Sequence, residues 1–176
     1  MKRFTLVCFL ILLSSQVYSG NGNPVFTNIK WYCQDAEAKK LYLKSEGISS
    51  FSLKSKPDYQ NQIVNQVKHI LNEKSGDISI CTEGNRNRTD LMFINRKLIS
   101  ISEEIYDISD SRKQEIIDET ARFYKRAQVS QNGPYIDYNF EFDNTKVLLI
   151  VRPKSGLNDI KIYYYAADLF EYMLLY

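Results

Sequence analysis

The chain has 176 residues, of which 44% are hydrophobic, and this is enough to bury the core of a globular domain. Its formal net charge of +2 corresponds to Lys2 and Arg3, because no acidic residue lies among the first 19 positions. The rest of the chain is therefore neutral and lacks the positive field that attracts phosphate backbones, so we expect no nucleic-acid partner.

Residues 1–19 have the features of a secretion signal. Two positive charges precede an apolar run, Phe4 to Ser14, whose length suits a signal-peptide core and is well short of the roughly 20 residues that span a bilayer. Further on, Val17 is a compact aliphatic residue and Ser19 a small one, which predicts cleavage after Ser19. We expect residues 20–176 to form a single exported domain, in the bacterial periplasm or outside the cell, with a membrane location only if the signal remains uncleaved.

Two cysteines, Cys33 and Cys81, remain once residues 1–19 are removed. In an oxidising compartment an isolated pair usually forms one disulfide bond. The sequence therefore predicts a Cys33–Cys81 bridge, with a reactive thiol as the alternative.

The first half of the predicted domain contains one well-marked helix. Pro57 suits the first helical position, apolar residues then recur at helical spacing, and Gly76 ends the run, so we expect a helix over 57–76. Four other segments are expected here: a half-buried strand at 25–33, a helix or strand at 35–44, and short extended segments at 48–53 and 77–81.

The second half combines a helix with strands. Ser and Asp residues can cap a helix that runs from about Ser109 to Gln128. The other expected elements are a hairpin of 91–94 and 98–102, a β-meander of 136–142, 147–151 and 160–165, and a short helix after Ala166.

These elements predict an α+β fold, with an antiparallel sheet of about six to eight strands, two main helices and a C-terminal β-meander. An open sheet is favoured, and a partly closed barrel is the alternative.

Residues that could carry catalysis are few. The chain has one histidine, His69, so a zinc site built on two histidines is excluded, and we expect neither a metal nor a cofactor. The acidic stretch 103–111 places oxygens at Asp107, Ser109 and Ser111 as a calcium loop does, but Arg112 stands where that loop needs glycine. Capping of the following helix is the favoured interpretation.

Two groups of residues are candidates for a partner surface. Basic side chains near one loop and one hairpin turn could bind a carboxylate or phosphate, and tyrosines on the last strand could contribute contact area. On an alternating strand, Tyr164 should lie on the face opposite Tyr163 and Tyr165. The candidate residues are Arg86, Arg88, Arg96, Lys97, Tyr163 and Tyr165.

Export, neutral charge, small size and the lack of a catalytic motif favour a non-enzymatic protein that binds another exported or membrane-anchored protein. It would act as a periplasmic accessory or chaperone-like subunit, or as an inhibitor or immunity protein. The alternatives are a domain that binds a small apolar ligand or acts as a sensory partner, with a pocket between the strand 135–142 and the helices, and a small secreted hydrolase using His69 or a carboxylate pair.

Overall fold

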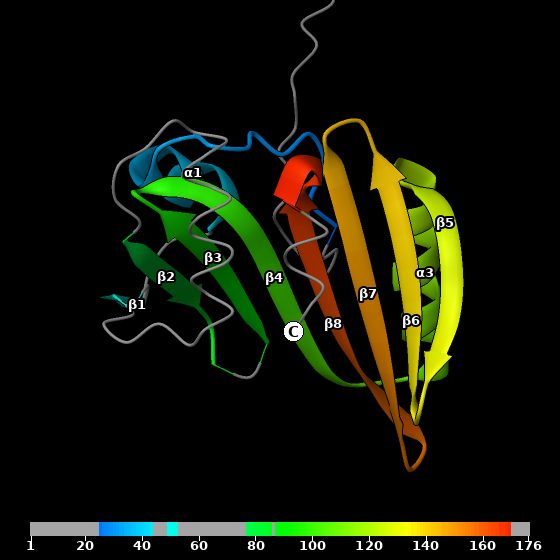
Figure 1. Ribbon diagram of the computed structural model, residues 1–176. Coiled ribbons are helices and arrows are strands. Elements are labelled where there is room, and N and C mark those ends of the chain that lie inside the picture. Colours follow the sequence, from blue (N-terminus) through cyan, green and yellow to red (C-terminus); the bar gives the residue numbers. More distant parts are fainter. Residues whose placement is uncertain (1–24, 44–48, 53–76, 86, 170–176) are drawn as a thin grey trace, which may run out of the picture.

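The computed structural model describes residues 25–43, 49–52, 77–85 and 87–169 (Figure 1). Eight strands form one antiparallel sheet in the order β1-β2-β3-β4-β8-β7-β6-β5. Their bounds are β1 Ser49–Ser52, β2 Ile78–Glu83, β3 Arg88–Ile94, β4 Lys97–Ile108, β5 Lys125–Asn132, β6 Tyr135–Phe142, β7 Thr145–Lys154 and β8 Leu157–Ala166.

The sheet joins two sets of sequential hairpins. Strands β1 to β4 form one set, β5 to β8 form the other, and β4 pairs with β8 at the junction. Strands β1 and β5 are its two edges and do not pair, so the sheet is open. This confirms the α+β class and the antiparallel sheet, whereas the alternative of a partly closed barrel is not confirmed.

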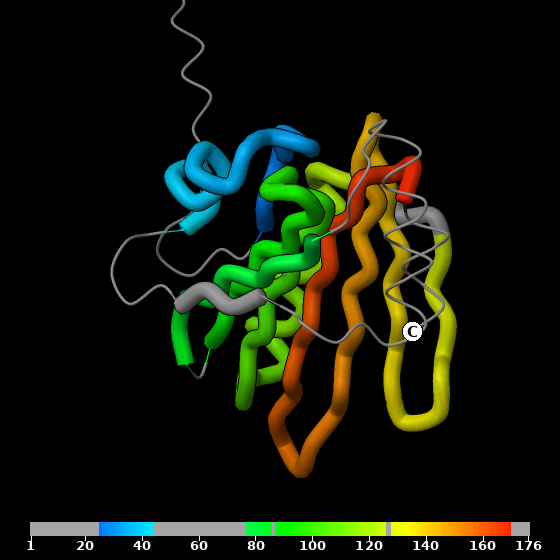
Figure 2. Tube along the Cα trace, turned by 60° about the vertical axis from the view of Figure 1, so that its left-hand side comes forward, coloured from blue at the N-terminus to red at the C-terminus, as the bar shows by residue number. Residues whose placement is uncertain are grey.

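Two described helices pack against the sheet. Helix α1 (Asp35–Tyr42) contacts β3 and β4, and α3 (Asp110–Phe123) contacts β5, β6 and β8. Both lie behind the sheet in Figure 1, and the turned view of Figure 2 shows α1 on that side of the strands. The Ser109 hydroxyl accepts a hydrogen bond from the Arg112 N–H at 3.2 Å, which confirms the predicted helix cap.

The core lies between these helices and the sheet, around Tyr164 on β8. Its ring is fully buried and packs edge-on against Phe26, with the ring centroids 5.5 Å apart. Phe26 in turn packs against Tyr42 of α1, and its carbonyl accepts a hydrogen bond from the Tyr124 hydroxyl just beyond α3. Tyr164 therefore joins both helices to the sheet.

Residues 25–33 are not a strand, in contrast to the expectation from sequence. Asn28 and Tyr32 have φ angles of 54° and 60°, which break the extended conformation twice. The apolar residues are nevertheless buried, as the alternation suggested, because the bent segment lies across the core. Burial was predicted correctly here, and only the backbone conformation was wrong.

The second predicted helix is shorter than expected, and a strand follows it. Helix α3 ends at Phe123, and the expected last turn belongs instead to β5, which pairs with β6 with a register shift between Arg126 and Gln128. Its sequence, KRAQVSQN, is polar because β5 is an exposed edge strand with a partner on one side only.

The other expectations have mixed outcomes. Residues 35–42 are helical, and the hairpin of β3 and β4 and the meander of β6 to β8 are confirmed, with both hairpin strands longer than expected. Strand β2 also extends beyond the expected segment 77–81, to Glu83. The helix predicted over 57–76 lies outside the described residues, as do residues 1–19.

None of the helices in the described ranges has the length and apolar character needed to cross a bilayer.

Candidate binding site

The outer face of the sheet, defined here as the face turned away from α1 and α3, carries a pocket of about 330 Å³. The alternation of each strand assigns residues to this face: on β8, Ile160, Ile162 and Tyr164 point to the core, so Lys161 and Tyr163 point outward. The pocket spans β4, β8, β7 and β6. Its lining residues are Glu104, Tyr106, Tyr135, Ile150, Arg152, Asp159, Ile160, Lys161 and Tyr163.

Glu104 on β4 is the centre of one charged cluster in the pocket. Its carboxylate accepts hydrogen bonds from Lys161 Nζ at 2.5 Å and from the Tyr106 hydroxyl, and Arg88 Nη2 lies 3.4 Å away. Burial alone would raise the pKa of Glu104, but the two hydrogen bonds and the nearby positive charges outweigh it and lower that pKa. The carboxylate is therefore held in its ionised form.

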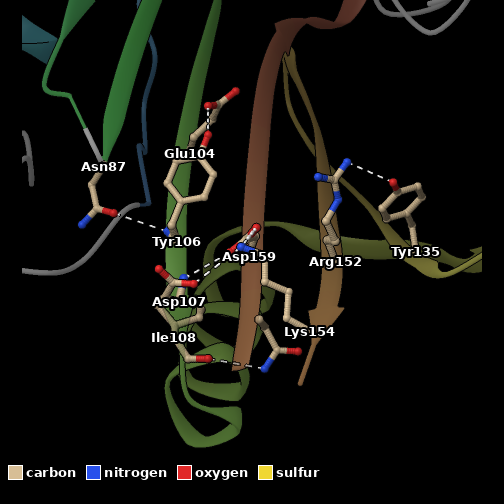
Figure 3. A network of polar contacts seen from close by, with 10 residues as sticks. Asn87, Glu104, Tyr106, Asp107, Ile108, Tyr135, Arg152, Lys154 and Asp159 are labelled. Atoms are coloured by element: carbon tan, nitrogen blue, oxygen red, sulfur yellow. Dashed lines mark hydrogen bonds and ion pairs between the residues drawn. The ribbon is translucent and has the colours of Figure 1, made fainter. Parts of the chain in front are cut away.

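A second charged cluster is centred on Asp159 of β8, and Figure 3 shows it together with Glu104 and Tyr106 of the first cluster. Asp159 Oδ2 lies 2.6 Å from Lys154 Nζ, while Oδ1 accepts a hydrogen bond from the Asp107 N–H at 3.1 Å. Asp107 has a φ angle of 56° at the point where the β4–β8 register shifts. Asp159 thus holds an irregular segment of β4 in place.

Arg152 and Tyr135 form the opposite side of the pocket. Arg152 Nη2 donates to the Tyr135 hydroxyl at 2.9 Å, and the guanidinium carbon lies 5.0 Å from the centroid of the same ring. Both contacts are available because Arg152 and Tyr135 stand nearly opposite each other on β7 and β6, one position beyond the Val151–Ile136 pair. The guanidinium is exposed at the rim of the pocket.

Tyr163 and Tyr165 lie on the outer face, opposite Tyr164, as the alternation predicted. Their rings stack with centroids 5.8 Å apart and planes within 7° of parallel. Tyr163 is half-buried and lines the pocket, whereas Tyr165 is buried, with 6% of its surface exposed. Of the two predicted surface tyrosines, only Tyr163 offers substantial contact area.

The predicted basic residues do not gather at one place. Arg88, at the start of β3, pairs with Asp90 at 3.0 Å and contacts the Glu104 cluster. Arg96 lies beyond the other end of β3 and pairs with Asp35 of α1 at 3.0 Å. Lys97 begins β4 beside Arg96, and Arg86 lies outside the described residues. Since Arg88 is the first residue of the seven-residue β3 and Arg96 lies beyond its last, the structure does not bring them together.

Cys33 and Cys81 are both buried, and the structure contains both as free thiols. Burial raises the pKa of the Cys33 thiol, so this thiol is poorly suited to act as a nucleophile. The predicted bridge stays a prediction.

The site offers recognition chemistry more readily than acid–base chemistry. A general acid works best with a pKa near the working pH, whereas the pKa of Glu104 is lowered. His69, the residue that a hydrolase would use according to the sequence analysis, lies outside the described part of the chain. Within that part, no group of three or more His, Cys, Asp or Glu side chains could hold a metal ion.

Sequence reasoning missed Arg152, Tyr135 and Ile150. The sequence pattern that could have identified them is the alternation that placed Tyr163 correctly on the outer face, because its neighbours on β7 share that face. What the sequence lacked was the strand order, which places β8 between β4 and β7. No family model, curated protein or solved structure matches this chain.

Proposed function

We propose that this chain is an exported, non-enzymatic protein that binds another exported or membrane-anchored protein through the outer face of its sheet. The observation that carries this proposal is the pocket between β4 and β6, which combines three tyrosines with an exposed arginine. Tyrosine and arginine are among the residue types enriched where proteins meet. The features of residues 1–19 in the sequence support export.

The filled core on the other face also favours this proposal. Phe140, Val147, Leu149 and Tyr164 fill the space under the helices where a pocket for an apolar ligand was expected, and each is at most 1% exposed. The open pocket instead lies on the outer face, where its walls are amphipathic.

Site-specific photo-crosslinking in the native host tests this function. Leu148 is half-buried on the outer face and lies between Tyr163 and Asn139 in the sheet, so p-benzoylphenylalanine at this position would face a bound partner. Asp118 on the exposed side of α3 is the control position. We expect a discrete protein adduct from position 148 and none from position 118. No adduct from position 148, or equal labelling at both positions, would count against the proposal.

A second candidate is recognition of a small amphipathic ligand, which the pocket volume of about 330 Å³ favours because it lies within the usual range for small-molecule sites. Native mass spectrometry of the protein isolated from its host distinguishes the two. A bound small molecule that is lost on substituting Tyr163 would support the second candidate.

A further inference from the structure

In the described part of the chain, Arg152 and Lys161 line the pocket, and Arg88 and Lys154 contact acids of its lining. These cations differ in whether a carboxylate already contacts them. Lys161 and Arg88 contact Glu104, and Lys154 contacts Asp159. Arg152 has no carboxylate within ion-pair distance among the described residues, and its one hydrogen-bond partner there is a neutral tyrosine hydroxyl. The pocket therefore contains one guanidinium with unused charge and donors.

Strand register alone would give Arg152 an acidic partner. Arg152 and Asp159 are directly opposite on β7 and β8, where cross-strand side chains of opposite charge normally interact. Asp159 is engaged elsewhere, because Lys154 Nζ holds one oxygen and the Asp107 N–H holds the other. Figure 3 shows the Arg152 guanidinium turned toward Tyr135 while the Asp159 carboxylate lies toward Asp107.

Tyr135 holds the guanidinium in a fixed position. Its ring lies 5.0 Å from the guanidinium carbon, and its hydroxyl accepts from Nη2. Arginine on an aromatic ring keeps its charge and loses little freedom on binding, because the planar group is already oriented. Five N–H groups belong to a guanidinium, so donors remain for a second acceptor.

The surroundings suit a carboxylate attached to an apolar body. Ile150 and Tyr163 supply apolar surface beside the charged rim of the pocket. Glu104 and Asp159 would repel a second carboxylate, but each is already neutralised by a lysine at 2.5 Å and 2.6 Å. Planar arginine donors match the two oxygens of a carboxylate.

We infer that Arg152 and Tyr135 form a carboxylate-binding site, and that its occupant is an acidic side chain or chain terminus of the partner protein. This inference rests on the proposed function, because it names the chemistry by which the outer face recognises its partner. In this site Arg152 makes the specific contact, and Tyr163 and Ile150 supply apolar support.

Titration of the full chain with sodium benzoate, followed by the NMR signal of the Arg152 Nε–H group, tests the site without any partner. Benzamide is the matched neutral probe. We expect benzoate to shift this signal and the amide signals of Ile150 and Tyr163, and benzamide to leave them unchanged. Because a bidentate contact is lost, Arg152→Gln should weaken benzoate binding, read from the two amide signals, by about tenfold, and Arg152→Lys by less.

Arg122→Gln is the control variant, since it removes the same charge from an exposed position on α3 and should leave benzoate binding unchanged. Equal shifts with benzoate and benzamide, or unchanged affinity in Arg152→Gln, would overturn the inference.

The crosslinking experiment tests separately whether the bound carboxylate belongs to a partner protein. With p-benzoylphenylalanine at position 148, Arg152→Gln should strongly reduce the partner adduct, whereas Arg122→Gln should not. An undiminished adduct in Arg152→Gln would overturn the inference while leaving the proposed function standing. A different outcome would be benzoate binding that requires Arg152 together with no adduct in the wild type. It would support the carboxylate site but contradict the protein-binding function, and it would overturn the assignment of a partner protein as the occupant.

Discussion

The indole N–H of Trp31 donates a hydrogen bond to the hydroxyl of Thr145 at 2.9 Å, across 114 positions of sequence. Trp31 is 8% exposed and Thr145 is 4% exposed, so water does not replace this bond. It ties the bent segment 25–33 to the first residue of β7. The same hydroxyl also contacts Asn144, so one side chain anchors both the turn before β7 and the amino-terminal segment.

Replacing Thr145 with valine keeps the shape of the side chain but leaves the indole N–H buried without an acceptor. We expect Thr145→Val to lower the free energy of unfolding by about 1–3 kcal/mol, the usual cost of an unsatisfied buried donor. Urea unfolding followed by the fluorescence of Trp31, the only tryptophan, measures this change. Thr145→Ser, which retains the hydroxyl, should lose less, and an equal loss in both variants would contradict the prediction.

Two glycines with positive φ angles should respond differently to alanine. Gly84 has a φ angle of 85°, and a Cβ atom there would lie 2.2 Å from the Asn87 carbonyl oxygen. Gly133 has a φ angle of 61° and open space around it. The left-handed conformation alone costs an L-residue about 1–2 kcal/mol, so Gly133→Ala should cost this amount and Gly84→Ala clearly more. Thermal unfolding of the two variants measures the difference, and similar melting temperatures would contradict the role of the clash.

The parts of the fold that sequence predicted well are those whose pattern is local. Strand β6 alternates apolar and polar residues, β7 contains the continuous apolar run from Val147 to Val151, and the Ser109 cap is readable from its own turn. Strand β5 was missed because its Lys, Arg, Ala and Gln residues suit a helix, and only pairing with β6 makes the segment extended.

The candidate site was predicted in part, for the same reason. Tyr163 and Arg88 were identified from residue type, and both contribute to the outer face. Arg152 was not, because nothing near it in sequence marks it as different from any exposed arginine. Arg152 differs from other exposed arginines because its cross-strand neighbour, Asp159, is already paired with Lys154. The contacts of Asp159 follow from the pairing of β7 with β8 and from the bulge at Asp107.

Lys154 should therefore control the carboxylate site indirectly. In Lys154→Met, Asp159 loses its ammonium partner and becomes available to Arg152, which faces it across the two strands. We expect benzoate affinity to fall about two- to fivefold, the range for competition by an exposed ion pair. Lys154→Arg keeps a cation beside Asp159 and should bind as the wild type does. An NMR titration measures both, and a rise in affinity in Lys154→Met would contradict this account.

The ion-pair cluster of Glu104 should make stability depend on pH in the acid range. The pKa of Glu104 is lowered in the folded state, so its contribution to stability is fully present above the unfolded pKa of about 4.3 and is lost as the pH falls through the folded value. Glu104→Gln removes the charge that Lys161 and Arg88 contact, and at pH 7 it should cost about 1–3 kcal/mol, since the lost hydrogen bonds involve a charged group with a side chain only 12% exposed.

The difference between wild type and Glu104→Gln should shrink below pH 4.3 and disappear at the lowest pH, because both chains then carry a neutral side chain at this position. Urea unfolding at a series of pH values measures this convergence. Glu115→Gln is the control, because Glu115 pairs with Arg112 on the exposed side of α3 with 63% of its side chain exposed, and its loss should matter much less at any pH. A constant gap between wild type and Glu104→Gln from pH 7 to pH 3 would mean that the glutamate stabilises the sheet through its shape and not through its charge.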